Sequence, residues 1–286
     1  MHTIILDTDI GSDVDDALAL ATVLGSESVN LLGITTVYGD TKLRARIAHH
    51  LCHIANKSIP VFAGVETPLS GREVWSTGSE GKAFSNLNQY ALEDKTAVEF
   101  LVEAVNQNPG EIEVIAIGPL SNIATAIMQA PNFVKNVKHL WVMGGDFTKE
   151  KIEHNFKCDI SAAKIVLESE ISITILDLPS SQKTIIKKDE IEQIKSSGKL
   201  GPILYTEILN WIQPRNQDWT TPHDPIAVIA MLEPELFSFS DKGSVQIGED
   251  GKSDWRFNQE GNVKRVSPSK PLEAVRAMIS LIAKVN

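Results

Sequence analysis

The sequence predicts a single α/β domain in which a mostly parallel central sheet is flanked by helices. The chain has 286 residues, of which 42% are hydrophobic, so it can bury one large core. Short runs rich in Ile and Val alternate with stretches of helical periodicity. These runs are apolar on both faces, as is typical of strands in a parallel sheet covered on both sides. We therefore expect one domain over residues 1–286.

Five apolar runs are expected to be strands, and each precedes a helix or a loop that leads to one. They cover residues 3–8, 29–37, 112–118, 137–145 and 171–177. Residues 75–94 are polar and rich in Gly and Ser, which indicates a long loop. Residues 201–216 predict a helix ending near Pro214, another helix begins at His223 and Asp224, and residues 272–285 predict a closing amphipathic helix. Because parallel strands end at one edge, the loops after the first four strands should meet there.

Composition excludes several classes of partner. Against 37 Asp and Glu the chain has only 27 Lys and Arg, a net charge of -10, so we do not expect it to bind nucleic acid. The first residues lack the basic and apolar regions of a leader peptide, and no apolar run is long enough to cross a bilayer, so we expect a cytoplasmic protein without a membrane partner. Cys52 and Cys158 lack the spacing of a metal motif or a disulfide framework.

The loop after the first expected strand is unusually acidic. It contains five aspartates within ten positions, and no Lys or Arg occurs before Lys42: the aspartates are Asp7, Asp9, Asp13, Asp15 and Asp16. A solvated surface, helix capping and a cation site are the competing explanations. Capping accounts for one or two carboxylates, whereas an unpaired carboxylate at the end of an apolar strand is costly. A hard divalent cation such as Ca²⁺, which takes six to eight oxygen ligands, explains the cluster best.

Two known aspartate motifs fit less well. An EF-hand loop needs Glu at its twelfth position, and counting from Asp7, Asp9 or Asp13 places a leucine there (Leu18, Leu20 or Leu24). A haloacid dehalogenase-like phosphatase would use the Asp-x-Asp pair, but Gly11 stands where that family usually has Thr or Val. The phosphatase remains an alternative, as does a ribose- or nucleoside-binding protein without turnover.

Seven segments, in order, resemble motifs of the inosine-uridine preferring nucleoside hydrolase family. They are "DTDIGSDVDDALAL", "GITTVYGD", "VFAG", "IGPLSNIA", "VMGG", "EHNFKCDISAAK" and "HDPIAV". The resemblance implies a Ca²⁺-dependent enzyme that hydrolyses the N-glycosidic bond of ribonucleosides to ribose and free base. It also implies a homodimer or homotetramer.

The resemblance assigns roles to individual residues. Asp9 would bind the metal and accept a proton from the attacking water, while Asp16, Asp224 and the backbone carbonyl of Ser121 would complete the metal site. Asp15, Glu153 and Asn155 would bind the ribose hydroxyls. Asp40 stands where the family usually has an Asn that contacts substrate. His223 would lie near the leaving base as a general acid, with helix capping as its structural alternative.

The chain departs from the family pattern at two places, and one aromatic residue is open to two interpretations. The aspartate loop is two residues longer, which leaves the role of Asp13 open, and Thr77 precedes Gly78 where the family often has His. Trp211 lies 12 positions before His223 and is a candidate wall of the base pocket, although tryptophans at helical spacing more often belong to the core. The sequence does not rank the nucleosides.

Overall fold

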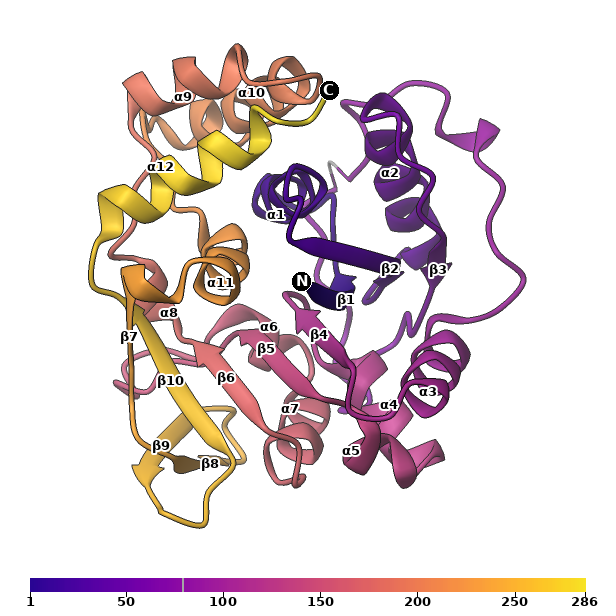
Figure 1. Cartoon of the computed structure of the whole chain (residues 1–286), viewed down its shortest axis with the longest axis vertical. Helices are drawn as coiled ribbons and strands as arrows, with labels where there is room; N and C mark the ends of the chain where they lie inside the picture. The colour runs from indigo at the N-terminus through magenta and orange to yellow at the C-terminus, as the bar shows by residue number, and fades with distance from the viewer. Residues whose placement is uncertain (79) are drawn as a thin grey trace.

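One ten-stranded sheet runs through the protein, in the order β3-β2-β1-β4-β5-β6-β10-β8-β9, with β7 paired to β10 (Figure 1). The structure is a computed structural model that describes residues 1–78 and 80–286. Six neighbouring strands are parallel, which confirms the predicted sheet. They are β1 (His2–Thr8), β2 (Val29–Thr36), β3 (Val61–Ala63), β4 (Ile112–Ala116), β5 (His139–Met143) and β6 (Ile173–Leu176).

The carboxyl-terminal end of the sheet is mostly antiparallel, and the sequence analysis did not predict it. It contains β7 (Phe237–Phe239), β8 (Gly243–Ile247), β9 (Ser253–Phe257) and β10 (Val263–Pro268). Strand β10 runs parallel to β6 but antiparallel to β7 and β8. These short strands mix buried and exposed positions, so they lack the continuous apolar runs that identified the parallel strands.

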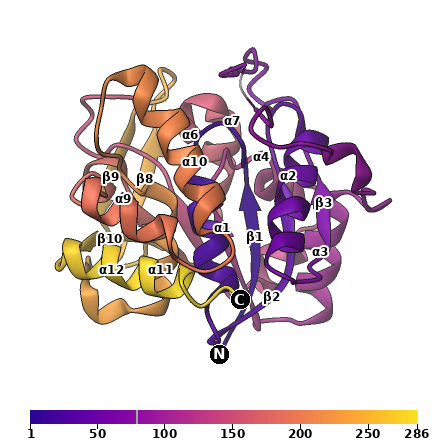
Figure 2. The ribbon, with the colours of Figure 1, turned by 90° about the horizontal axis from the view of Figure 1, so that it is seen from above.

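The sheet separates two hydrophobic cores, and the alternation of β1 shows how. Ile4 and Leu6 contribute to one core, whereas Ile5 contributes to the other. Helices with side chains in the first core are α1 (Asp15–Leu24), α2 (Thr41–Ile54), α9 (Lys188–Lys195), α10 (Gly201–Ile212), α11 (His223–Leu232) and α12 (Pro271–Ile282). The second contains side chains of α3 (Ala97–Gln107), α4 (Ser121–Gln129), α5 (Asn132–Asn136) and α7 (Ile160–Leu167). In Figure 2, α2 and α3 lie at the right of the molecule, and α9, α10 and α12 lie at the left.

Shorter elements complete the chain. They are the helical turns α6 (His154–Cys158) and α8 (Leu178–Ser181) and the 3-10 turns η1 (Leu87–Gln89), η2 (Gln213–Arg215) and η3 (Pro234–Leu236). The predicted long loop over 75–94 holds η1 as its one regular element among the described residues. The predicted helix over 201–216 ends at Ile212 and continues as η2, which contains Pro214. No helix in the described part of the chain is long and apolar enough to span a membrane.

Candidate active site

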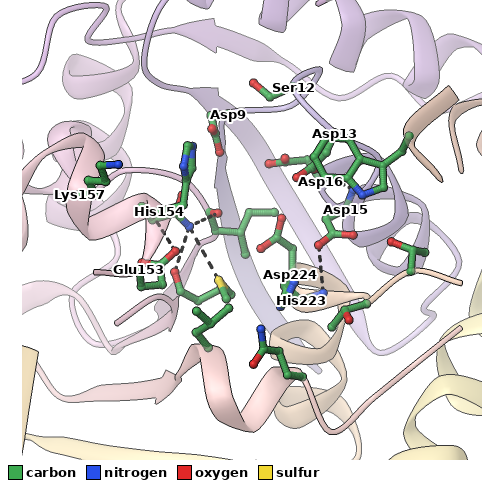
Figure 3. A pocket seen from close by; sticks show the side chains of 18 of the residues that line it. Asp9, Ser12, Asp13, Asp15, Asp16, Glu153, His154, Lys157, His223 and Asp224 are labelled. Atoms are coloured by element: carbon green, nitrogen blue, oxygen red, sulfur yellow. Dashed lines mark hydrogen bonds between the residues drawn. The ribbon is translucent and has the colours of Figure 1, made fainter. Parts of the chain in front are cut away.

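A cavity of about 590 Å³ opens where β1, β4 and β5 end. The loop after β1 contributes Asp9 and Asp13 to its wall, the start of α1 contributes Asp15 and Asp16, and α11 contributes Asp224. In Figure 3 the side chains of Asp13, Asp15, Asp16 and Asp224 gather on one side, and Glu153 lies across the cavity from them. The predicted meeting of the strand-end loops is confirmed for the loops after β1, β4 and β5.

The aspartate loop is shaped by a turn that only glycine fits. Gly11 has φ +110°, and a Cβ there would stand 2.7 Å from Ile47 Cδ1. After this turn Asp13 Oδ1 accepts the backbone N–H of Asp15 at 3.1 Å. Asp13 thus helps to start α1, and it also lines the cavity.

Asp7 belongs to the fold rather than to the cavity wall. It lies within β1, is fully buried, and its Oδ1 accepts Thr35 Oγ1 at 2.6 Å and Asn122 Nδ2 at 2.7 Å. Burial raises the pKa of Asp7 to about 7. The five aspartates of the opening segment therefore divide into one structural residue and four that line the cavity.

Helix α11 delivers Asp224 and His223 to the cavity. The backbone N–H of His223 donates to Asp15 Oδ2 at 3.1 Å, which joins the amino-terminal ends of α1 and α11 (Figure 3). The Nδ1 atom of His223 lies 2.7 Å from Ser181 Oγ. The Ser181 hydroxyl also lies 2.9 Å from the Leu178 carbonyl, so it has two acceptors within reach for its single hydrogen. Burial lowers the pKa of His223 to about 4.

The carboxylates impose a large electrostatic cost on one another. Burial is the largest cause that raises the pKa of Asp9, Asp13, Asp15, Asp16 and Asp224. For the last four, neighbouring aspartates raise the pKa further, and that of Asp13 reaches about 6. A bound cation would reverse this balance, because it favours every ionised carboxylate at once.

The donor set fits a hard cation by its chemistry. It consists of the carboxylate oxygens of the aspartates that line the cavity, which are the kind of ligand that Ca²⁺ prefers. Among residues 1–78 and 80–286, no three His, Cys, Asp or Glu side chains converge closely enough to hold an ion as they stand. Closure around a cation therefore requires rotation of the aspartate side chains.

Glu153 and Asn155 line the side of the cavity formed by α6. Glu153 caps this helix, since Oε1 accepts the N–H of Asn155 at 2.8 Å and Oε2 accepts those of Gly145 and Phe156 at 3.0 and 3.1 Å. Burial raises the pKa of Glu153. The Asn155 Nδ2 group donates to the carbonyls of Ile117 at 2.8 Å and Met143 at 3.2 Å. Both residues thus reach the cavity and also hold its loops together.

Aromatic residues occupy the outer part of the cavity. Trp211, a predicted base-pocket residue, lines it, and so do Trp75 and Trp219. The Arg215 guanidinium lies 3.4 Å from the Trp211 ring centroid and donates to the Trp211 carbonyl at 2.7 Å. Trp211 is also partly buried against the core, as its structural interpretation expected, and its contact with a base stays a prediction.

Two predicted site residues lie outside the cavity wall, and local backbone geometry explains both. Asp40 is exposed and caps α2, where its Oδ1 accepts the Leu43 N–H at 2.9 Å. Ser121 begins α4, and its carbonyl accepts the Thr125 hydroxyl at 2.7 Å. Neither residue is among those that line the cavity, so the substrate contact of Asp40 and the carbonyl ligand from Ser121 stay predictions that this geometry does not support. Ile117, four residues before Ser121, lines the cavity, and its carbonyl accepts from Asn155 Nδ2.

Several cavity residues were not predicted from the sequence. Met143 and His154 had no functional assignment, yet both line the cavity, and Trp75 lies edge-on to His154 with the ring centroids 5.0 Å apart. Signals existed for two of them, because Met143 lies near the end of an expected strand and His154 stands between Glu153 and Asn155. Ile117 also lines the cavity, and no side-chain motif marks it.

Comparisons with known proteins agree with this geometry. The family model described as inosine-uridine preferring nucleoside hydrolase matches residues 4–276. The chain is 31% identical to probable uridine nucleosidase 2 of Oryza sativa subsp. japonica, covering 94% of this chain and 85% of that protein. It is 29% identical to the pyrimidine-specific ribonucleoside hydrolase RihB of Escherichia coli O9:H4 (strain HS), covering 73% and 69%. A plant nucleoside hydrolase structure shares the fold, with a TM-score of 0.88, 24% identity and 99% coverage of each chain.

Proposed function

This chain belongs to the inosine-uridine preferring nucleoside hydrolase family, and from that premise we propose that it hydrolyses ribonucleosides to ribose and free base with the help of Ca²⁺. The observation that carries the cation is the cavity itself, which gathers the carboxylates of Asp9, Asp13, Asp15, Asp16 and Asp224. Family membership over residues 4–276 replaces the phosphatase alternative. Relatives named for uridine or pyrimidine hydrolysis make uridine the first substrate to test.

Asp9, Asp16 and Asp224 would hold the cation, with the Ile117 carbonyl in the role first assigned to Ser121. A bound Ca²⁺ would act as a Lewis acid that lowers the pKa of a water molecule and favours the ionised form of the surrounding carboxylates. Asp9 is the proton acceptor, because it lies between the aspartate cluster and the α6 side of the cavity (Figure 3). A Cβ on Gly118 would stand 2.7 Å from Asp9 Oδ1, so Gly118 leaves room for this carboxylate.

The rest of the cavity divides between sugar and base. Asp15, Glu153 and Asn155 surround the ribose, and the two carboxylates among them stabilise the positive charge that develops on the sugar as the C–N bond breaks. The base lies toward Trp211, whose outer face is stacked on Arg215. His223 lies between the aspartate cluster and this aromatic wall, as a partner of the departing base.

A nucleoside panel tests the proposal directly. Reducing sugar released from uridine, inosine, cytidine and adenosine is measured with Ca²⁺ and again with excess chelator. We expect Ca²⁺-dependent release, and Asp9→Asn should abolish turnover, because an amide does not accept the proton of water. The 2′-deoxyribosides should react much more slowly, since they leave polar partners unpaired. Nucleoside binding without any release of sugar would favour the non-catalytic alternative.

Location and assembly are proposals of the same kind. We propose a cytoplasmic homodimer or homotetramer, supported by the family resemblance and by two free, buried cysteines. Light scattering on the purified protein measures the assembly, and a monomeric mass would contradict this part of the proposal.

A further inference from the structure

Arg44 is a buried cation directly behind the aspartate loop. It lies on α2 and is 3% exposed. A buried guanidinium is usually paired with a carboxylate, yet the ion pairs found within the described residues do not include Arg44. Its hydrogen bonds show what it does instead.

The guanidinium holds the main chain on both sides of the turn at Gly11. Its Nη1 donates to the Ile10 carbonyl at 3.0 Å and also to the Asp9 carbonyl. Its Nη2 donates to Ser12 Oγ at 3.0 Å. Three positions around the turn, Asp9, Ile10 and Ser12, are therefore tied by one planar group. A lysine would supply the charge but not this fork of donors.

The same guanidinium ties a second loop. Its Nε donates at 2.7 Å to the carbonyl of Tyr38, a residue in the left-handed region with φ +68°. The Tyr38 hydroxyl in turn accepts the backbone N–H of Trp75 at 2.7 Å, and Trp75 lines the cavity. Arg44 thus links the aspartate loop to the loop after β2 and, through Tyr38, to the outer wall of the cavity.

These contacts also explain the two-residue expansion of the loop. The turn at Gly11 is followed by Ser12, whose hydroxyl is bound by Arg44, and then by Asp13, which lines the cavity. The expanded segment is therefore held from behind by α2 rather than by the cavity side. Because both carbonyls near Asp9 accept from Arg44, the peptide planes there are fixed and the Asp9 side chain is left free to face the cavity.

We infer that Arg44 is the positioning residue of the aspartate loop, and that its fork of hydrogen bonds sets the affinity of the cavity for Ca²⁺. This inference rests on the proposed function, because Asp9 is one of the proposed ligands. Arg44 touches neither the cation nor the substrate and acts through the backbone of the ligand loop. Changes to partners of this kind weaken metal affinity by about 10- to 100-fold.

The test compares Arg44→Lys, Ser12→Ala and the control Arg46→Lys. The control makes the same substitution two positions along α2, at a side chain outside the set that lines the cavity. Ca²⁺ binding to each purified, folded protein is measured by calorimetry, and thermal unfolding is measured without Ca²⁺. We expect Arg44→Lys to weaken Ca²⁺ binding about 10- to 100-fold, Ser12→Ala to weaken it by less, and Arg46→Lys to match the wild type.

Hydrogen exchange supplies a second readout that does not need the cation. In Arg44→Lys, exchange of backbone amides should rise in peptides covering residues 9–13 and 38–40, and stay unchanged in β5 and β6. Wild-type Ca²⁺ affinity in Arg44→Lys, with or without a lower melting temperature, would overturn the inference and leave Arg44 a structural residue. Failure of the wild type to bind Ca²⁺ would instead overturn the proposed cation, and the inference with it.

Discussion

Replacing Glu153 by Gln tests whether this carboxylate chiefly holds the site together. Its two oxygens accept three backbone N–H groups, from Asn155, Gly145 and Phe156. The glutamine oxygen can take the place of Oε2 and keep the bonds from Gly145 and Phe156. The NH₂ group of the glutamine then takes the place of Oε1 and faces the Asn155 N–H. Both groups are donors, so the Asn155 N–H loses its acceptor. The substitution therefore removes one charge-assisted hydrogen bond and leaves buried donors facing each other.

The magnitude follows from these contacts. A hydrogen bond to a charged group contributes about 1.5–3 kcal/mol, and an unsatisfied buried donor adds a penalty of about 1–3 kcal/mol. Since relaxation of α6 offsets part of this cost, we expect a loss of about 2–4 kcal/mol in the free energy of unfolding. At roughly 2–3 °C per kcal/mol for a chain of this length, the melting temperature should fall by roughly 4–12 °C.

Thermal unfolding followed by circular dichroism measures this loss. Because burial raises the pKa of Glu153, the measurement is made at pH 8, which favours its ionised form. Glu150→Gln is the matched control, because it removes the same charge three positions earlier from an exposed side chain. The control should melt with the wild type. If Glu153→Gln also melts with the wild type but loses most of its activity on uridine, the capping role is refuted and the carboxylate acts on the substrate alone.

Three further predictions follow from the cavity and the sheet. Asp16→Ala should weaken Ca²⁺ binding by more than the roughly 10- to 100-fold of an outer-shell change, and full metal content by elemental analysis would contradict it. His223→Ala should slow uridine hydrolysis by roughly 10²- to 10⁴-fold but a riboside with a stabilised phenolate leaving group far less, and equal losses on both would exclude an acid role. Burial lowers the pKa of His139 to about 4, so the unfolded chain takes up its proton first as the pH falls below about 6.5. Stability from this group is thus lost between about pH 6.5 and 4, and His139→Gln should flatten that part of a denaturation profile measured against pH.

Much of the fold was predictable because its central strands are continuous apolar runs. The five expected strands all form, and both helices expected near the site begin or end close to the predicted residues. The strands β7 to β10 were not predicted, because partly solvated strands carry no continuous apolar run. β3 was recognised through its family motif alone, since three residues are too few for a periodicity.

The candidate site was predictable where a side chain acts and hidden where the backbone acts. Asp9, Asp15, Asp16 and Asp224 reach the cavity as their motif positions implied. Ser121 does not reach the cavity. Residues at the start of a helix point their carbonyls along the helix axis, and the Ser121 carbonyl accepts the Thr125 hydroxyl there. Ile117, in the preceding loop, lines the cavity instead, and its carbonyl accepts from Asn155.

Only some of the five clustered aspartates therefore belong to the proposed cation site. Asp7 lies inside β1, where neighbouring strands and α4 surround it with the hydroxyl of Thr35 and the amide of Asn122. Asp9 lies just beyond the strand, where the backbone is free to turn and where Arg44 behind it binds the main chain and leaves the carboxylate facing the cavity. Asp7 is thus held within β1 by hydrogen bonds to one of its oxygens, while its buried Oδ2 has no partner among the described residues, whereas Asp9, one residue beyond β1, lines the cavity. That difference is set by where β1 ends, and the end of β1 is set by the glycine turn and by the arginine on α2.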